Sequence, residues 1–293
     1  MSKIVGTILA ITALFILLVP LHTWGDEDIS INVEEGSFAF KNLRLTQEEY
    51  HGGPILKGDI VNNTGKDWLN LEFEVDVYDT AGNKLKDLMG EPFRLLFFGI
   101  KSGATKSLGP GYGFHFIGVR AGAVQRYEIR FKSGEYRANY SFGMTKPKVS
   151  KDLLFEDAFV KISFIISKEQ IGFVILNKTS NPIKIDWNQV SYIDVLNESH
   201  KVMHSGVKYV DKANVLPPTI IPPTAKIQDI VFPTDHIYYT SGKYGGWNKI
   251  PIFPEAPKAR LFKGKTFSVF MPLEINGTVK NYLFTFIVED VDA

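Results

Sequence analysis

The chain has 293 residues, of which 44% are hydrophobic and 13% aromatic, and its formal net charge is +1. This composition excludes a disordered or collagen-like chain. The near-neutral net charge and the lack of a basic run exclude proteins that bind nucleic acids or anionic membrane surfaces. Because the chain has no cysteine, disulfides, thiolate metal sites, cysteine nucleophiles and a lipid-modified cysteine are excluded as well.

An apolar run at residues 4–21 follows Lys3, and the next charged residue is Asp26. This arrangement is typical of an export signal. We expect cleavage after Gly25, and the alternative is that residues 1–25 stay as a helical membrane anchor. Both outcomes predict an extracytoplasmic body that is periplasmic, secreted or cell-surface, with membrane contact only through an uncleaved segment. An exported protein without cysteine is typical of bacteria.

From Ile29 onward, β-branched and aromatic residues alternate with polar ones, and Gly, Asn, Asp or Pro separate the runs. The clearest case is residues 71–78, LEFEVDVY, in which apolar side chains occupy every odd position and carboxylates three of the four even ones. This alternation predicts a half-buried antiparallel strand, and the polar residues 79–84 predict the turn after it. No later stretch keeps a helical period for three turns, so the sequence predicts an all-β protein.

An internal comparison at an offset of 115 residues indicates a duplication. Residues 60–64, IVNNT, match residues 175–179, ILNKT, and Asp79 falls on Asp194. In both copies an apolar strand enters an Asn-x-Thr turn, and a second strand ends at an Asp followed by a polar turn. The repeat predicts two tandem immunoglobulin-like β-sandwich domains after the N-terminal signal or anchor helix.

The expected boundaries follow from composition. We place domain one at residues 29–136, a linker at 137–150 and domain two at 151–293. Domain two has spare length in a proline-rich stretch at 216–223, expected to be an extended edge or polyproline segment. More spare length lies at 234–257, expected to be a long surface loop.

The first copy resembles the FxLYD-type domains of exported prokaryotic proteins. The resemblance spans residues 55–132, and the motifs that carry it are Gly58-x-Ile60-x-Asn62-x-Thr64, then Val75-Asp76-Val77-Tyr78-Asp79 with Gly82, and then Leu108-Gly109-Pro110-Gly111 before Phe114-His115-Phe116. Val75 and Val77 stand where the family has Phe and Leu. The resemblance implies an immunoglobulin-like extracytoplasmic accessory or adhesion-like module without catalysis, and it supplies no ligand residues.

Common catalytic motifs are missing from the sequence. There is no G-x-S-x-G and no H-E-x-x-H. Gly264-Lys265-Thr266 resembles the end of a phosphate-binding loop, but Ala259 occupies the position of the first glycine and no helical pattern follows. The sequence therefore predicts a protein that is not an enzyme and has no cofactor or bound metal.

Two histidines are close enough in sequence to be considered as metal ligands. His200 and His204 lie four residues apart, about 13 Å along a strand, which is too far for shared metal ligation. A helix would bring them together, but Val202 and Gly206 favour a strand. We expect both histidines to face solvent.

The segment 237–248, IYYTSGKYGGWN, has the composition of a contact surface. Tyr238, Tyr239, Tyr244 and Trp247 combine rigid amphipathic rings with adaptable Gly, Ser and Asn residues. They are the candidate contacts for a protein or glycan partner. The competing interpretation, slightly favoured, is that these rings fold back and seal a long loop onto the sandwich.

The leading hypothesis is an exported, non-enzymatic binding or structural protein whose two β-sandwich modules engage a macromolecular partner. The second is a carbohydrate-binding module, which requires Tyr238, Tyr244 and Trp247 to form an exposed coplanar platform.

The third hypothesis is an enzyme of unrecognised type with its site in a cleft between the domains. It requires at least two of four histidines to approach a carboxylate in a concave pocket. These histidines are His51, His200, His204 and His236.

Overall fold

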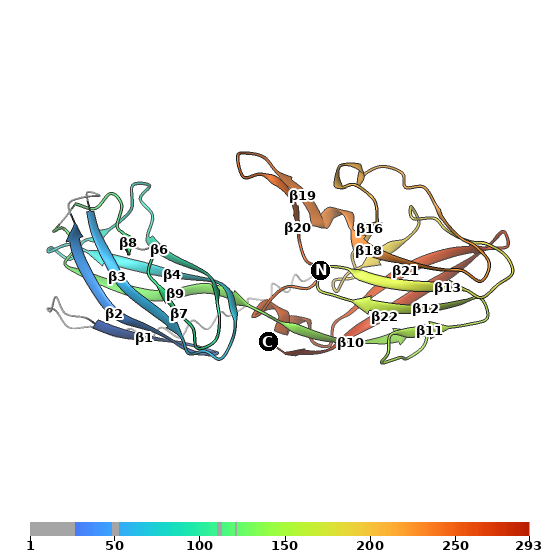
Figure 1. Cartoon of the computed structure of the whole chain (residues 1–293), viewed down its shortest axis with the longest axis horizontal. Helices are drawn as coiled ribbons and strands as arrows, with labels where there is room; N and C mark the ends of the chain where they lie inside the picture. Colours follow the sequence, from blue (N-terminus) through green and yellow to red (C-terminus); the bar gives the residue numbers. More distant parts are fainter. Residues whose placement is uncertain (1–26, 49–52, 110–112, 121, 293) are drawn as a thin grey trace, which may run out of the picture. The chain divides into compact units, whose positions relative to one another are not determined.

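The computed structural model describes residues 27–48, 53–109, 113–120 and 122–292. The chain forms two compact units (Figure 1): unit one extends to residue 65 and includes 71–133, and unit two comprises 66–70 and the chain from 134 onward. The predicted signal or anchor segment, residues 1–25, lies outside the described residues. Within the described ranges, no helix combines the length and hydropathy that a membrane span requires.

Unit one contains two antiparallel sheets. One has the order β1-β2-β3-β7, with β8 also paired to β3, and the other has the order β5-β4-β6, with β9 paired to β4. The strands are β1 (Glu27–Val33), β2 (Gly36–Glu48), β3 (Gly53–Asn62), β4 (Trp68–Tyr78), β5 (Lys84–Leu85), β6 (Phe93–Ile100), β7 (Thr105–Ser107), β8 (Phe114–His115) and β9 (Arg126–Tyr136).

The apolar side chains of β4 fill the core of unit one. Leu71, Phe73, Val75 and Val77 are each at most 1% exposed, as the alternation of residues 71–78 predicted. The ring of Phe73 meets Phe38 and Phe40 of β2 edge to face, at centroid distances of 5.4 and 5.1 Å. These cross-sheet aromatic contacts join the two layers.

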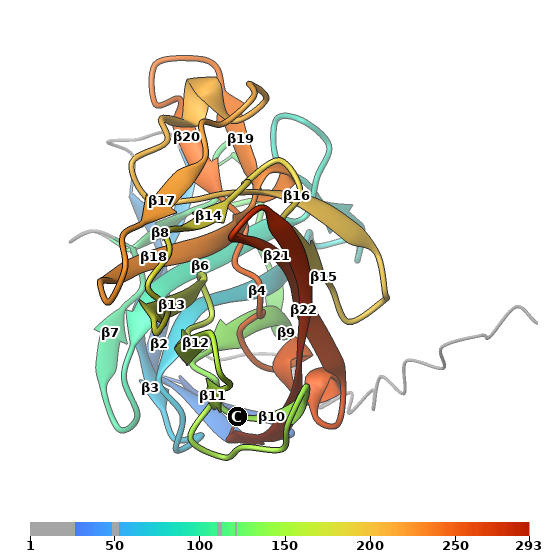
Figure 2. The same cartoon turned by 90° about the vertical axis from the view of Figure 1, so that its right-hand side faces the viewer.

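Unit two is a larger sandwich. Its first sheet has the order β11-β12-β13-β18, and its second has β10-β22-β21-β15-β16, with β14 paired to β21 and β17. The strands are β10 (Asn139–Lys146), β11 (Leu154–Glu156), β12 (Val160–Ile166), β13 (Ile171–Asn177), β14 (Ile183–Ile185), β15 (Ser191–Ile193), β16 (Ser199–Met203), β17 (Thr219–Ile221), β18 (Lys226–Pro233), β21 (Thr266–Ile275) and β22 (Thr278–Asp292). Pairing of β16 with β18 joins the sheets along one edge (Figure 2).

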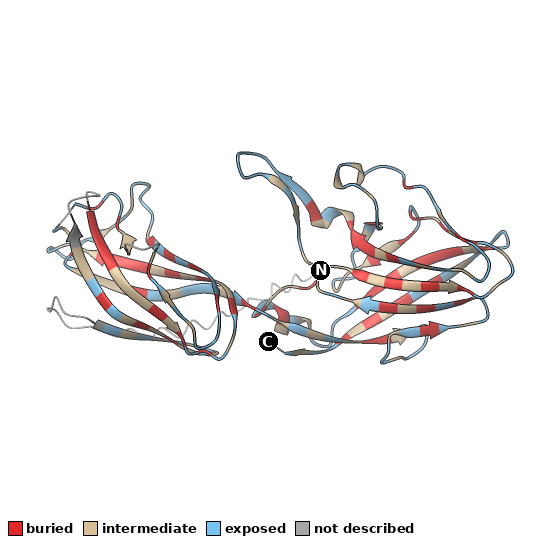
Figure 3. Cartoon of the chain, in the orientation of Figure 1, coloured by how far each residue is buried: buried red, intermediate tan, exposed pale blue. Residues whose placement is uncertain are grey.

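Buried residues alternate along the strands of both units (Figure 3). In unit two the largest fully buried side chain is Trp187, and Phe164 of β12 packs against Phe284 and Phe286 of β22 at 4.9 and 5.0 Å between ring centroids. The described helical segments are short 3-10 turns. The predicted all-β class is confirmed.

The same strand pairing occurs in both units. The edge sheet β1-β2-β3-β7 of unit one has its counterpart in β11-β12-β13-β18 of unit two. The central strands align at the offset of the sequence match, whereas their partners do not: Val61 pairs with Thr105, and Leu176, 115 residues after Val61, pairs with Lys226, which is 121 residues after Thr105.

The two Asn-x-Thr turns have the same hydrogen bonds. Asn62 Oδ1 accepts from the backbone N and the Oγ1 of Thr64, at 3.1 and 2.7 Å. Asn177 Oδ1 accepts from the same two groups of Thr179, both at 2.8 Å. Both asparagines are fully buried, so each amide satisfies backbone groups where the chain leaves its strand.

The predicted linker at 137–150 is wrong. Residues 139–146 form β10, which pairs with β22. Tyr140, Phe142 and Met144 alternate toward the core, and Phe142 packs on Phe253 with 5.0 Å between ring centroids. The main part of unit two therefore begins at residue 134 rather than 151, and unit two also includes residues 66–70. Gly143 lies within this strand rather than in a linker, and a Cβ at this position would meet the side chain of Glu289.

The two proline-rich stretches also differ from expectation in part. Within 216–223, β17 pairs with β14, so this stretch contains an extended strand. Within 234–257, the surface loop is instead a short hairpin followed by a packed segment. Ile252, Phe253 and Ala256 in that segment are at most 6% exposed, because their apolar side chains complete the core beside β10.

Candidate functional site

The hairpin of unit two is formed by β19 (Ile237–Thr240) and β20 (Gly246–Lys249), and it extends beyond the sheets of its unit (Figures 1 and 2). It follows η3 (Thr234–His236), a 3-10 turn at the end of β18. Gly245 closes the turn: its N–H donates to Gly242 O at 2.9 Å, and a Cβ there would lie 2.2 Å from Thr240 O. A glycine is therefore needed at position 245 for the tight turn.

A small apolar cluster holds the base of the hairpin. Ile237 is 1% exposed and packs with Met203 of β16 and Phe232 of β18. Tyr209 of η2 (Tyr209–Asp211) packs against this cluster and meets Trp247 at a centroid distance of 6.0 Å. The base is thus fixed to the sandwich, and the rest of the hairpin faces solvent.

The candidate contact rings are exposed. Tyr238 is 47%, Tyr239 62%, Tyr244 92% and Trp247 42% exposed. The slightly favoured interpretation, in which these rings seal a loop onto the sandwich, is therefore wrong. The rings lie on a two-stranded hairpin whose own hydrogen bonds support it, so they need not fold back.

The rings do not form the coplanar platform that the carbohydrate hypothesis requires. Tyr239 and Trp247 are cross-strand partners on one face, with 5.5 Å between centroids and an interplanar angle of 66°. Tyr238 pairs with Asn248 and points to the opposite face, since side chains alternate along a strand. The hairpin presents aromatic groups on both faces rather than a flat surface.

The hairpin is also basic. Residues 237–250 contain Lys243 and Lys249 and no carboxylate. The Nζ of Lys243 lies 5.4 Å from the Tyr244 ring centroid, and that of Lys249 lies 5.5 Å from the Tyr209 centroid. Aromatic and cationic groups are therefore displayed together, within the distance of about 6 Å at which a lysine ammonium group is attracted to an aromatic ring.

A histidine and carboxylate cluster lies beside the base of the hairpin. His200 of β16 has Nδ1 at 2.6 Å from Asp235 Oδ2 of η3 and Nε2 at 3.6 Å from Asp194 Oδ2. Burial lowers the pKa of His200, but the hydrogen bond and charge of Asp235, together with the charge of Asp194, outweigh it and raise that pKa. Asp194, Glu198 and His200 each place one potential ligand atom within 4.8 Å of the others.

His204 lies in a separate environment. Its ring stacks on Trp187 at 4.2 Å with an interplanar angle of 9°, and its Nδ1 lies 3.4 Å from Asp229 Oδ2. The structure therefore does not bring His200 and His204 onto a shared site, and the strand predicted there is confirmed as β16. The expectation that both face solvent is wrong, because their side chains are only 12% and 15% exposed.

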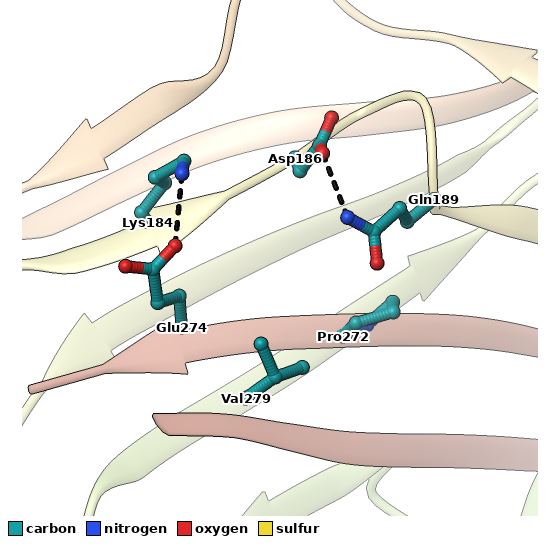
Figure 4. A pocket seen from close by; sticks show the side chains of 6 residues that line it. All are labelled: Lys184, Asp186, Gln189, Pro272, Glu274 and Val279. Atoms are coloured by element: carbon teal, nitrogen blue, oxygen red, sulfur yellow. Dashed lines mark hydrogen bonds and ion pairs between the residues drawn. The ribbon is translucent and has the colours of Figure 1, made fainter. Parts of the chain in front are cut away.

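The enzyme hypothesis requires two histidines that approach carboxylates in a concave pocket, and the described residues meet this requirement only in part. His200 and His204 both approach carboxylates, whereas His51 lies outside the described residues. The pocket shown in Figure 4 lies elsewhere, with a volume of about 30 Å³, and it is lined by Lys184, Asp186, Gln189, Pro272, Glu274 and Val279. Lys184 pairs with Glu274 at 2.8 Å and Gln189 donates to Asp186 at 2.8 Å. Its polar groups satisfy one another, and it has room for a water molecule rather than a substrate.

No protein-family model matches the chain, and no curated protein matches it either.

Proposed function

We propose that this chain is an exported, non-enzymatic binding protein of two duplicated β-sandwich domains, and that it engages a protein partner through the β19–β20 hairpin. The observation that carries the proposal is the exposure of four aromatic rings on a hairpin that extends beyond its unit. Exposed clustered tyrosine and tryptophan supply large contact area at small cost in side-chain entropy.

The arrangement of the rings favours a protein partner over a glycan. Tyr239 and Trp247 meet edge to face, and Tyr238 lies on the other side, so the hairpin can enter a groove and contact both of its walls. Flat stacking on a sugar ring would need coplanar faces. Lys243 and Lys249 indicate an acidic rim on the partner.

The proposal also includes the duplication and the extracytoplasmic location. The two copies share the pairing of their edge sheets and the hydrogen bonds of both Asn-x-Thr turns. The resemblance of the first copy to FxLYD-type domains and the N-terminal apolar segment support an accessory role outside the cytoplasm. Such modules act through surfaces grafted on a stable fold.

The proposal is tested by replacing three exposed rings together, as Tyr239→Ser, Tyr244→Ser and Trp247→Ser. The thermal midpoint should stay close to that of wild type, while retention of the partner from the extracytoplasmic fraction should fall at least tenfold. A matched control is the pair Val215→Ser and Leu261→Ser, which are 83% and 73% exposed in the same unit and should retain the partner.

Two results would contradict the proposal. One is equal retention by the hairpin variant, the control variant and wild type. The other is specific binding of the hairpin to immobilised glycans with no protein retained, which would favour the carbohydrate-binding alternative.

A further inference from the structure

The histidine and carboxylate cluster has the arrangement of a metal site. Asp194 and Glu198 lie in the turn between β15 and β16, and His200 is the second residue of β16. Their ligand atoms lie within 4.8 Å of one another. In a tetrahedral zinc site with bonds of about 2.0–2.2 Å the ligand atoms lie about 3.3–3.6 Å apart, so a closure of up to about 1.5 Å is needed. The exposed side chain of Glu198 can supply this movement.

Hydrogen bonding orients His200 for a metal at Nε2. Its Nδ1 lies 2.6 Å from Asp235 Oδ2, so the single proton of a neutral ring would sit on Nδ1, and Nε2, which lies 3.6 Å from Asp194 Oδ2, would then be the nitrogen that binds a metal. Nε2 is buried and has no hydrogen-bond partner. A metal-bound histidine usually donates its other ring N–H to a carboxylate, as His200 does to Asp235. A buried ring nitrogen without any partner costs free energy, and a metal ion at Nε2 would remove that cost.

The equivalent turn of unit one shows what is particular to this site. There Asp79 Oδ1 accepts from the N–H groups of Ala81 and Asn83, as Asp194 Oδ1 does from those of Leu196 and Glu198.

The two turns differ in the side chains that close them. In unit one, the amide of Asn83 donates to Asp79 Oδ2 at 3.0 Å and occupies that oxygen. At the offset of 115, Glu198 replaces Asn83 and His200 replaces Leu85. The closing amide is thus exchanged for a carboxylate and an imidazole, both of which can bind a metal ion.

We propose that Asp194, Glu198 and His200 bind a divalent transition-metal ion of the Zn²⁺ type, with Asp235 as the positioning residue for His200. An imidazole ligand favours Zn²⁺ and its neighbours over Ca²⁺ and Mg²⁺, which prefer oxygen ligands alone. Three protein ligands leave a position for water. The site does not depend on the proposed role of the hairpin.

The test is calorimetric titration of the full chain with Zn²⁺ and, separately, Ca²⁺. We expect one Zn²⁺ per chain and no stoichiometric Ca²⁺. Glu198→Asn, which copies the turn of unit one, should weaken Zn²⁺ binding at least tenfold without loss of folding, and His200→Ala should abolish it. Asp235→Asn should weaken it about 10- to 100-fold. His204→Gln, the other histidine beside a carboxylate, should bind like wild type.

A competing occupant of Nε2 is a proton, which would make His200 an imidazolium paired with Asp194 and Asp235. Nitrogen NMR separates the two, because Zn²⁺ should shift the His200 Nε2 resonance and remove any proton from it. Absence of Zn²⁺ binding, equal binding by wild type and Glu198→Asn, preference for Ca²⁺, or a persistent Nε2–H at saturating Zn²⁺ would each overturn the proposal.

Discussion

Asn62 and Asn177 are buried polar residues on which the ends of β3 and β13 depend. Beyond the bonds to Thr179, Asn177 Nδ2 donates to Asn181 O at 2.7 Å and to Ile221 O at 3.1 Å. Asn62 Nδ2 donates to Ile100 O at 3.2 Å. Each amide therefore joins two segments of its sandwich that are distant in sequence.

Replacement of Asn177 by Ala should destabilise the protein because buried backbone groups lose their partners. We expect a loss of about 2–4 kcal/mol in the free energy of unfolding, from more than one buried hydrogen bond. Urea unfolding followed by tryptophan fluorescence measures it. Asn139→Ala, at an exposed Asn-x-Ser triplet, should change the value by less than about 0.5 kcal/mol. Similar values for the two variants would show that the turn does not depend on its side chain.

Asp157 gives a pH-dependent prediction. Burial raises the pKa of its carboxyl, but hydrogen bonds from Lys280, from the N–H groups of Val160 and Phe159, and from Tyr282 outweigh burial and lower that pKa. A carboxyl whose pKa is lower in the folded protein stabilises it above the unfolded pKa of about 3.9, and this stabilisation is lost as pH falls toward the folded pKa.

Asp157→Asn should therefore be less stable than wild type at pH 7 by about 1–3 kcal/mol, and the difference should shrink below about pH 4. Urea unfolding at several pH values measures the difference. Asp290→Asn, at an exposed pair with Lys263, should show a much smaller difference at pH 7. A gap for Asp157→Asn that is constant down to pH 3 would contradict the account.

Residue-scale features were predictable from sequence when they were local. The Asn-x-Thr turns and the Asp that closes the second strand stand out in the 115-residue comparison. The contact between His200 and Asp235 was not predictable, because the two residues meet only when β16 lies beside η3.

At the scale of elements, β10 shows where sequence patterns fail. Its alternation of Tyr140, Phe142 and Met144 is regular, but Gly143 and Pro147 favoured a linker. The partner strand β22 follows about 140 residues later, so no local signal indicates the pairing. Strand pairing between distant segments depends on packing that a single sequence does not display.

Phe142→Ala tests whether residues 137–150 belong to the sandwich. The ring packs on Phe253 and Phe267, so its loss should lower the free energy of unfolding by about 3 kcal/mol. Val149→Ala, at a position that is 77% exposed, should change it by less than about 0.5 kcal/mol. Denaturant unfolding of both variants measures these changes. If neither substitution changed the free energy of unfolding, residues 137–150 would be a linker, as the sequence predicts.

The sequence predicts the aromatic character of the β19–β20 segment but not its two-stranded hairpin structure. The sequence marked Tyr238, Tyr239, Tyr244 and Trp247 as a possible contact surface, but exposure depends on whether the glycines close a turn or a loop. The register pairs Tyr239 with Trp247 and sets Tyr238 on the opposite face, and this decides against a flat platform.

At the scale of the whole molecule, each unit contains the same path of four edge strands, to which unit one adds β8, and unit two adds β10 and β22 to its second sheet. The all-β class followed directly from period-two alternation, which is a strong local signal. The positions of the units in sequence followed from the repeat, and the boundary at residue 134 required the structure.

Export makes a prediction about the mature chain. If residues 1–25 are removed, N-terminal sequencing of the protein recovered outside the cytoplasm should begin at Asp26. A mature chain that keeps the apolar segment and sediments with membranes would favour the anchor, and recovery only from the cytoplasm would contradict export.

The most direct test of the hairpin as a partner surface is photo-crosslinking in the producing cell. A photoreactive amino acid replaces Tyr244, which is 92% exposed on the hairpin, or Leu261, which is 73% exposed in the same unit. The account predicts a discrete protein adduct at position 244 that is absent at 261. No adduct at 244, or the same adducts at both positions, would contradict it.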